Sequence, residues 1–132
     1  MPLVRIALRA GKSASYRLLV GDAVHQALVE AIGVPPKDRF QIITEHDDAG
    51  LIYDPSYLGI ERSDDVVLVQ ITLSTGRTVE KKKALFARIA SLLAEKPGLR
   101  REDVFISLVE VVKENWSFGN GVAQYAEPAP QQ

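Results

Sequence analysis

The sequence predicts an α+β domain with a two-layer α/β architecture. Duplicated β-α-β units would form a four-stranded mixed sheet with two helices on one face. Two observations lead to this fold class. The chain repeats itself at an offset of 65 residues, and each copy has the hydrophobic pattern of a strand, a helix and a second strand. With 132 residues, the chain fits a single domain, 1–132.

The internal repeat is the strongest evidence for this fold. A shift of 65 residues, without any gap, pairs identical residues of several chemical types. The pairs include Leu3 and Leu68, Ile6 and Ile71, Gly11 and Gly76, Gly33 and Gly98, Asp38 and Asp103, Phe40 and Phe105, and Glu45 and Glu110. Two unrelated β-α-β units would share apolar positions, but identical Gly, Asp, Phe and Glu residues in one register favour duplication.

The first unit spans residues 2–45. Its opening strand is expected at 3–8, and Ser13 is a candidate N-cap for the helix that follows. The apolar stripe of that helix consists of Val20, Val24, Ala27 and Leu28. Gly33 is a helix stop signal, and the closing strand is expected at 40–45.

The second unit spans residues 66–110. Its opening strand, 66–73, is nearly all apolar, as in a strand that is covered on both faces. Thr78 is the matching candidate N-cap. The helix stripe follows at spacings i, i+4, i+7 and i+8 with Leu85, Ile89, Leu92 and Leu93. The closing strand is expected at 104–109.

The connections determine the expected topology. A strand-helix-strand link of this length makes the two strands of each unit parallel, with a right-handed crossover. Both helices would cover one face of the sheet, so the other, apolar face predicts an oligomer. Residues 46–65 are a polar, turn-rich connector. Residues 111–132 are expected to form a C-terminal hairpin at Asn120-Gly121 and a tail, 127–132, that is flexible or reaches a neighbouring subunit.

Composition argues against several classes of protein. Sixteen Lys and Arg against 17 Asp and Glu give a net charge of −1, which predicts no nucleic-acid partner. The chain has no cysteine, and His25 and His46 lack metal-ligand spacing, so we expect no metal and no cofactor. No apolar run suits a signal peptide or a membrane span, which favours a cytoplasmic protein without a membrane partner.

Pro2 follows the initiator methionine. A small second residue permits removal of Met1, which would leave a secondary amine at the start of the first strand. An α-amino group titrates near pH ~8 and can therefore act as an acid or a base near neutrality. Proline is also tolerated at the first position of a strand for purely structural reasons.

The duplication that begins at Pro2 resembles the tautomerase superfamily, whose members use an amino-terminal proline in catalysis. The similarity covers Pro2 to about Tyr125. Within the superfamily it is greatest to the malonate semialdehyde decarboxylases. The matching segments are Gly33-Val34-Pro35-Pro36-Lys37-Asp38-Arg39-Phe40-Gln41, Leu58-Gly59-Ile60-Glu61-Arg62-Ser63-Asp64-Asp65, Arg77-Thr78-Val79-Glu80 and Asn115-Trp116-Ser117-Phe118-Gly119-Asn120-Gly121.

The resemblance implies roles for individual residues. Pro2 would be the acid/base amine, Asp38 the carboxylate that orients or activates water, and Arg77 the cation that holds the substrate carboxylate. Trp116 and Phe118 would form an apolar wall. A turn-capping role for Asp38 and a core-filling role for the two aromatic residues remain structural alternatives.

Position 75 departs from the family pattern. Malonate semialdehyde decarboxylases usually carry two arginines in the loop before the second helix, and the first of them is Thr75 in this chain. One guanidinium can still hold a carboxylate through two hydrogen bonds. The departure therefore bears on decarboxylation more than on carboxylate binding.

Three functions are consistent with these residues. The resemblance implies a cofactor-independent homotrimer that acts on a small anionic oxo-acid, decarboxylating 3-oxopropanoate to acetaldehyde and carbon dioxide, with possible hydratase activity. The first alternative is keto-enol tautomerisation of a 2-oxo acid such as phenylpyruvate. The second is a non-enzymatic trimeric binding protein that keeps the fold and an idle proline.

Overall fold

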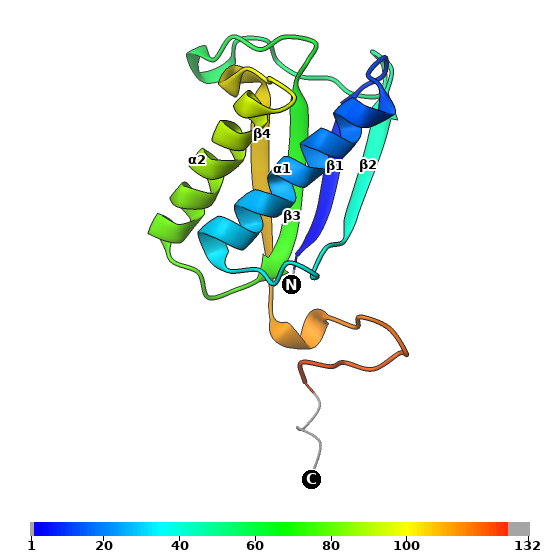
Figure 1. Cartoon of the computed structure of the whole chain (residues 1–132), viewed down its shortest axis with the longest axis vertical. Helices are drawn as coiled ribbons and strands as arrows, with labels where there is room; N and C mark the ends of the chain where they lie inside the picture. The colour runs from blue at the N-terminus through cyan, green and yellow to red at the C-terminus, as the bar shows by residue number, and fades with distance from the viewer. Residues whose placement is uncertain (1, 127–132) are drawn as a thin grey trace.

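The computed structural model describes residues 2–126 and contains one four-stranded mixed sheet in the order β2-β1-β3-β4 (Figure 1). Strands β1 and β2 are parallel, β3 and β4 are parallel, and β1 and β3 pair antiparallel. The strands are β1 (Leu3–Arg9), β2 (Gln41–His46), β3 (Val67–Ser74) and β4 (Val104–Val111). The duplicated topology expected from the repeat is confirmed, with strand ends displaced by one or two residues.

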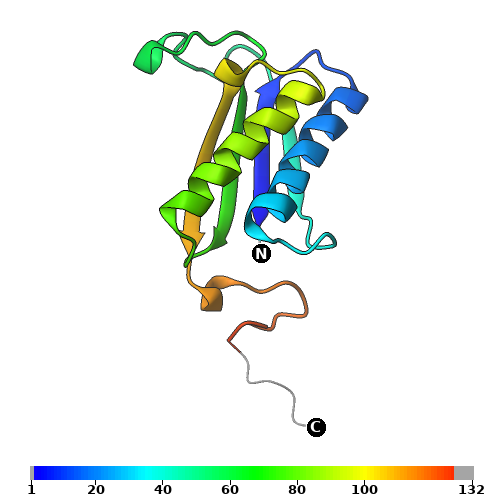
Figure 2. The ribbon, with the colours of Figure 1, turned by 60° about the vertical axis from the view of Figure 1, so that its left-hand side comes forward.

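The helices α1 (Ala14–Ile32) and α2 (Val79–Glu95) lie side by side on one face of the sheet (Figures 1 and 2). Their expected N-caps are confirmed, because Ser13 Oγ accepts from the Tyr16 amide at 3.0 Å and Thr78 Oγ1 accepts from the Lys81 amide at 3.2 Å. Helix α1 ends at Gly33, whose φ of +72° is the left-handed conformation that favours glycine.

The core lies between the sheet and the helices. Alternate side chains of β1 and β3 point into it, as the pleat of a strand requires. The predicted helix stripes meet these side chains from the other side. The buried residues of the four elements include Val4, Ile6, Leu8, Val20, Val24, Ala27, Leu28, Val69, Ile71, Leu85, Ile89 and Leu93.

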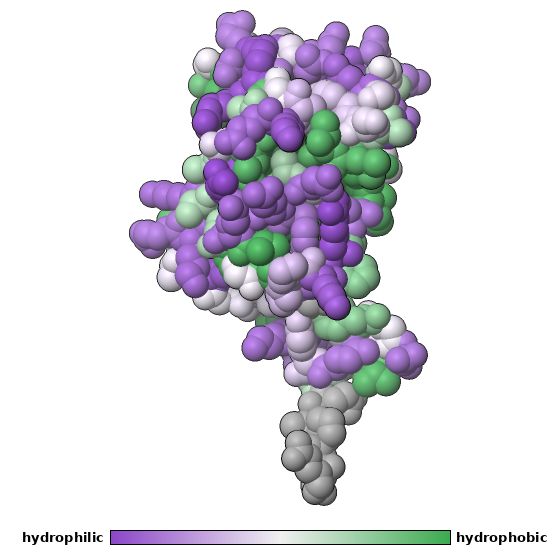
Figure 3. Space-filling model, in the orientation of Figure 1, coloured by the Kyte–Doolittle hydropathy of each residue, from purple (hydrophilic) through white to green (hydrophobic). Residues whose placement is uncertain are grey.

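The two faces of the molecule differ in character. The helix side carries mainly hydrophilic residues (Figure 3). On the opposite face of the sheet, Ile42, Phe105 and Val109 are exposed, and β1 to β4 line a shallow hollow of about 430 Å³. This face lies open, as the one-sided placement of the helices predicts, but it is only partly apolar, because Arg5, Gln70 and Ser107 also line the hollow. Among residues 2–126, no helix is long and apolar enough to span a membrane.

The chain after β4 differs from the expected hairpin. A short 3-10 turn at Lys113–Asn115 follows β4, and no further strand occurs up to residue 126. The Asn120-Gly121 turn is present, with positive φ at both residues, but it closes a loop instead of joining two strands. The Gln124 side chain closes this loop in place of strand pairing. Its Oε1 accepts from the Phe118 amide, and its Nε2 donates to the Gly119 carbonyl, both at 2.9 Å. The tail at 127–132 lies outside the described residues.

Asp103, the counterpart of Asp38 in the second unit, has a structural role. Its side chain is fully buried and accepts hydrogen bonds from the Ser63 amide at 2.6 Å and the Ser63 hydroxyl at 2.7 Å. Arg100 Nη1 lies 3.6 Å from the carboxylate. Asp103 thus ties the connector, 46–65, to the start of β4.

Asp103→Ala is expected to lower the free energy of unfolding by about 2–3 kcal/mol, because two hydrogen bonds to a buried carboxylate are lost and the partly buried donors of Ser63 lose their acceptor. Urea denaturation would measure this loss. Glu102→Ala is the matched surface control, and its exposed ion pair with Arg100 should contribute less than about 1 kcal/mol. Equal losses for the two variants would contradict the structural role of Asp103.

Candidate active site

The candidate active site lies at the end of the sheet where β1 begins and β3 and β4 end (Figure 1). Leu3 pairs with Thr72 of the antiparallel β3, so Pro2, the residue before Leu3, lies beside the last residues of β3. Pro2 is buried there. The loop from Thr75 to Thr78 leaves β3 at the same end and leads into α2.

Arg77 lies in this loop and lines a pocket of about 430 Å³ together with Thr75, Lys113 and Tyr125. Its side chain is held by a hydrogen bond from Nη1 to the Ser74 carbonyl at 2.8 Å. The pocket opens at the amino-terminal end of α2, where backbone N–H groups and the helix dipole favour an anion. Guanidinium and helix end therefore favour the same kind of ligand, a small carboxylate.

The two predicted aromatic residues form a stack under this pocket. The rings of Trp116 and Phe118 lie 5.5 Å apart between centroids at an interplanar angle of 18°. Trp116 Nε1 donates to the buried Ser74 hydroxyl at 3.0 Å, which anchors the C-terminal segment to the end of β3. Neither ring lines the pocket. A third aromatic residue, which packs against Phe118, lies between this stack and the pocket.

That residue is Tyr125, which sequence reasoning missed. It packs edge-on against Phe118, with 5.0 Å between ring centroids, and it lines the pocket beside Arg77. The pKa of Tyr125 is raised, first by burial and then by the negative charge of Asp38, while Arg77 acts in the opposite direction. Tyr125 thus lies within the electrostatic reach of two predicted site residues. The repeat could not reveal it, because it has no counterpart in the first unit.

Asp38 lies in the turn that precedes β2, where its amide donates to the Pro35 carbonyl at 2.9 Å. Only 7% of the residue is exposed. Burial raises the pKa of its carboxyl group, and the positive charge of His25 acts in the opposite direction. A buried carboxyl group with a perturbed pKa is a candidate acid or base.

Asp38→Asn is expected to unfold at the same or a higher urea concentration than the wild type at neutral pH. Because the folded-state pKa of Asp38 is raised, the stability that this group contributes is present below its unfolded pKa and is lost as pH rises through the folded pKa. The difference in urea midpoint between the variant and the wild type should vanish in acid. A lower midpoint for the variant at neutral pH would contradict this sign.

Sequence profiles of tautomerase enzymes match residues 38–119 and 2–60. Together with the duplicated fold, these matches show that the chain belongs to the tautomerase family. The chain is accordingly an enzyme of the isomerase or lyase type, which sets aside the alternative of a non-enzymatic binding protein.

Individual relatives cover nearly the whole chain. The probable tautomerase YusQ of Bacillus subtilis (strain 168) is 44% identical over 127 residues, which cover 96% of this chain and 100% of that protein. The probable tautomerase YrdN of the same organism is 36% identical over 125 residues, covering 95% and 96%.

Among solved structures, the FG41 malonate semialdehyde decarboxylase inhibited by 3-bromopropiolate has a TM-score of 0.88 and 43% identity, covering 96% of this chain and 99% of that one. A second malonate semialdehyde decarboxylase, described with decarboxylase and hydratase activities, has a TM-score of 0.88 and 32% identity over 93% and 95%. These values confirm the resemblance to this branch of the family.

Proposed function

We propose that the protein decarboxylates 3-oxopropanoate to acetaldehyde and carbon dioxide, using the amine of Pro2 after Met1 has been removed. The observation that carries this proposal is the position of Arg77, which is anchored to Ser74 in a pocket at the end of β3 beside the start of β1. The identity of 43% with a malonate semialdehyde decarboxylase supports the choice of substrate.

In the proposed reaction, Arg77 holds the carboxylate of the substrate and protonated Pro2 donates a hydrogen bond to the aldehyde oxygen. The bond between C2 and the carboxyl carbon breaks, and carbon dioxide leaves. The electron pair of that bond moves toward the carbonyl, whose oxygen takes the proton and forms an enol. Protonation of C2 by a solvent water, with return of the enol O–H proton to the amine of Pro2, then gives acetaldehyde, so that one solvent proton is consumed for each carbon dioxide released. Asp38 assists as the carboxylate that orients or activates water.

Hydration of an acetylenic acid would use the same residues. Asp38 would activate a water molecule for attack on the triple bond, and Pro2 would supply the proton to the neighbouring carbon. The apolar face of the stacked Trp116 and Phe118 would restrict the water that reaches the site.

The second candidate function is keto-enol tautomerisation of a 2-oxo acid such as phenylpyruvate. Here neutral Pro2 would act as a base, and Arg77 would again hold the carboxylate. Thr75 favours this candidate, because a neutral residue in the pocket leaves one arginine, which is sufficient for carboxylate binding. The two Bacillus relatives are also named as probable tautomerases.

The proposed assembly is a homotrimer built on the open face of the sheet. Exposed Ile42, Phe105 and Val109 supply the apolar surface that such an interface buries. A fused 4-OT that is similar to this chain, with 25% identity and a TM-score of 0.77, is described as a symmetric trimer. Light scattering of the purified protein is expected to give about three times the monomer mass of 14.5 kDa; Phe105→Glu, which places a charge on that face, should lower it.

Proton NMR of 3-oxopropanoate with protein whose mass confirms loss of Met1 tests the reaction. Acetaldehyde should form with the wild type at a rate well above that of a Pro2→Ala control. Absence of acetaldehyde with the wild type would refute decarboxylation, and phenylenolpyruvate would then test the tautomerase.

A further inference from the structure

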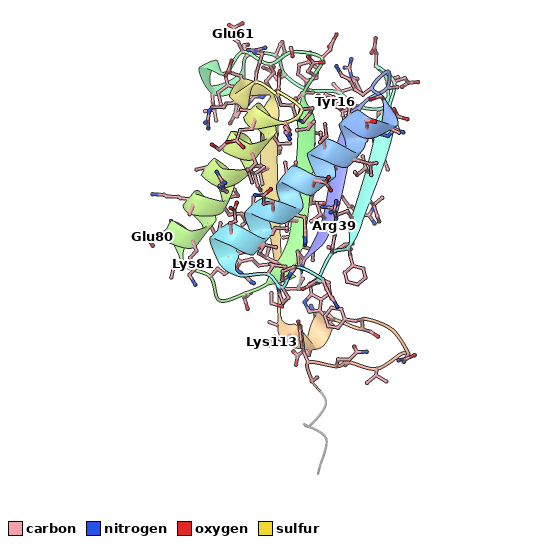
Figure 4. All side chains as sticks on the ribbon, viewed as in Figure 1. Tyr16, Arg39, Glu61, Glu80, Lys81 and Lys113 are labelled. Atoms are coloured by element: carbon pink, nitrogen blue, oxygen red, sulfur yellow. The ribbon has the colours of Figure 1, made fainter. Side chains whose placement is uncertain are left out.

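The pocket that contains Arg77 holds more positively charged side chains than the proposed reaction requires. Three cationic side chains line it, Arg77, Lys81 and Lys113, and each comes from a different part of the fold. No Asp or Glu side chain is among the described residues that line the pocket. Lys81 belongs to the first turn of α2 and Lys113 to the turn after β4, both at the same end of the molecule (Figure 4).

These lysines are not engaged elsewhere in the described part of the chain. Neither Lys81 nor Lys113 forms an ion pair within residues 2–126, and both are exposed. The next residue of α2 behaves differently, since Lys82 Nζ lies 2.7 Å from Glu110 Oε1. A structural lysine thus has its carboxylate partner, whereas the two pocket lysines are available to an anion.

The backbone of Lys113 is held in place on both sides. Before it, the Thr75 amide donates to the Val111 carbonyl at 2.9 Å and so continues the pairing of β3 with β4 by one residue. After it, Trp116 is tied to the hydroxyl of Ser74 at 3.0 Å. The turn that carries Lys113 is therefore fixed across from the loop of Thr75 and Arg77. The backbone of Lys81 is held as well, by its place in the first turn of α2 and by the hydrogen bond from its amide to Thr78 Oγ1 at 3.2 Å.

We propose that Lys113 is a substrate-binding residue and the second cation of this site. Arg77 would hold one carboxylate of the ligand, and the Lys113 ammonium would bind the oxygen at its other end, which is the aldehyde oxygen of 3-oxopropanoate or the second carboxylate of malonate. Thr75 brings no charge to this pocket, so Lys113 supplies the second charge from the turn that follows β4. This inference rests on the proposed function in placing a small oxo-acid in the pocket.

Malonate, an unreactive analogue with two carboxylates, is the probe. Its affinity would be measured by calorimetry at low ionic strength for the wild type, Lys113→Met, Lys113→Arg and Lys83→Met, beside kcat and KM for 3-oxopropanoate. Lys83 is an exposed lysine of α2 that does not line the pocket, so Lys83→Met controls for the loss of one surface charge. Lys113→Met is expected to bind malonate about five- to tenfold more weakly, which is a modest loss because the lysine is exposed. Lys113→Arg should retain most of the affinity.

The outcomes separate this inference from the proposed function. A wild type that releases no acetaldehyde but binds malonate through Lys113 would refute the reaction and leave the inference standing. An active wild type whose Lys113→Met variant matches Lys83→Met in malonate affinity and in KM would overturn the inference alone. A wild type that does not bind malonate would overturn it as well.

Discussion

Protein that retains Met1 is expected to turn over 3-oxopropanoate at least about 100-fold more slowly than protein that begins at Pro2, because acid/base catalysis by one group typically contributes ~10²–10⁴-fold. With Met1 attached, the nitrogen of Pro2 is an amide that neither holds nor releases a proton near neutral pH. Pro2 is buried beside the end of β3, close to the loop of Arg77. Two preparations of the same chain, with and without Met1 by mass spectrometry, would be compared in kcat.

Circular dichroism and the oligomeric mass of the two preparations provide the control, and both should agree. Equal kcat values for the two forms would refute a role for the amine. The pH dependence of kcat/KM in the mature form then separates the two candidate reactions. A pKa of the amine well above neutrality favours the decarboxylase, which needs protonated Pro2, and one near or below neutrality favours the tautomerase. In general, a nearby guanidinium lowers the pKa of an amine and a nearby carboxylate raises it.

Local sequence patterns were sufficient to predict the fold because each pattern occurs in both repeated units. The alternation in Leu3–Arg9 recurs in Val67–Ser74, and the N-caps Ser13 and Thr78 have closely similar geometry, with hydrogen bonds of 3.0 and 3.2 Å. Within the two repeated units, errors are confined to strand ends, where pairing with a neighbouring strand decides how far the ladder continues.

The repeat was misleading for one pair of matching residues, because residues at matching positions need not have the same role. Asp38 and Asp103 occupy matching positions and both are buried. Asp103 is bonded by Ser63 of the connector, whereas burial is the main influence on Asp38 and raises its pKa. The connector precedes only the second unit, so long-range contacts, which no local pattern encodes, separate a structural carboxylate from a candidate catalytic one.

The C-terminal segment has no counterpart in the first unit, and there the sequence was least informative. Trp116 and Phe118 were predicted through a family motif, but their stacking on the end of β3 depends on the Ser74 hydroxyl. Tyr125 lines the pocket after the Asn120-Gly121 turn, which closes a loop without a hairpin, and Lys113 lines it from the 3-10 turn that follows β4. A turn signal defines the reversal of the chain, and tertiary contacts decide where the returning segment packs.

Arg77→Met is expected to lower kcat/KM for the oxo-acid by about 100-fold, since a charge-assisted hydrogen bond to a carboxylate contributes ~1.5–3 kcal/mol and ~1.4 kcal/mol corresponds to a factor of ten. The variant also loses the bond to the Ser74 carbonyl, but this single, partly buried bond should cost about 1 kcal/mol of unfolding free energy. Arg77→Lys keeps the charge without the paired donors, so its kcat/KM should lie between the values of the wild type and Arg77→Met. Arg101→Met, an exposed arginine that does not line the pocket, is the matched control and should remain active.

The kinetic constant that changes distinguishes the role of Arg77 from that of Pro2. A guanidinium that holds the carboxylate equally in the bound substrate and in the transition state acts mainly on KM, whereas an amine that transfers a proton acts on kcat. The loss in Arg77→Met should therefore appear as a higher KM, and the loss on blocking Pro2 as a lower kcat. If Arg77→Met lowered kcat at unchanged KM, the guanidinium would act on the departing carboxylate or on the developing enol. Both proposed reactions would then need Arg77 at the reacting carbons instead of at the carboxylate alone.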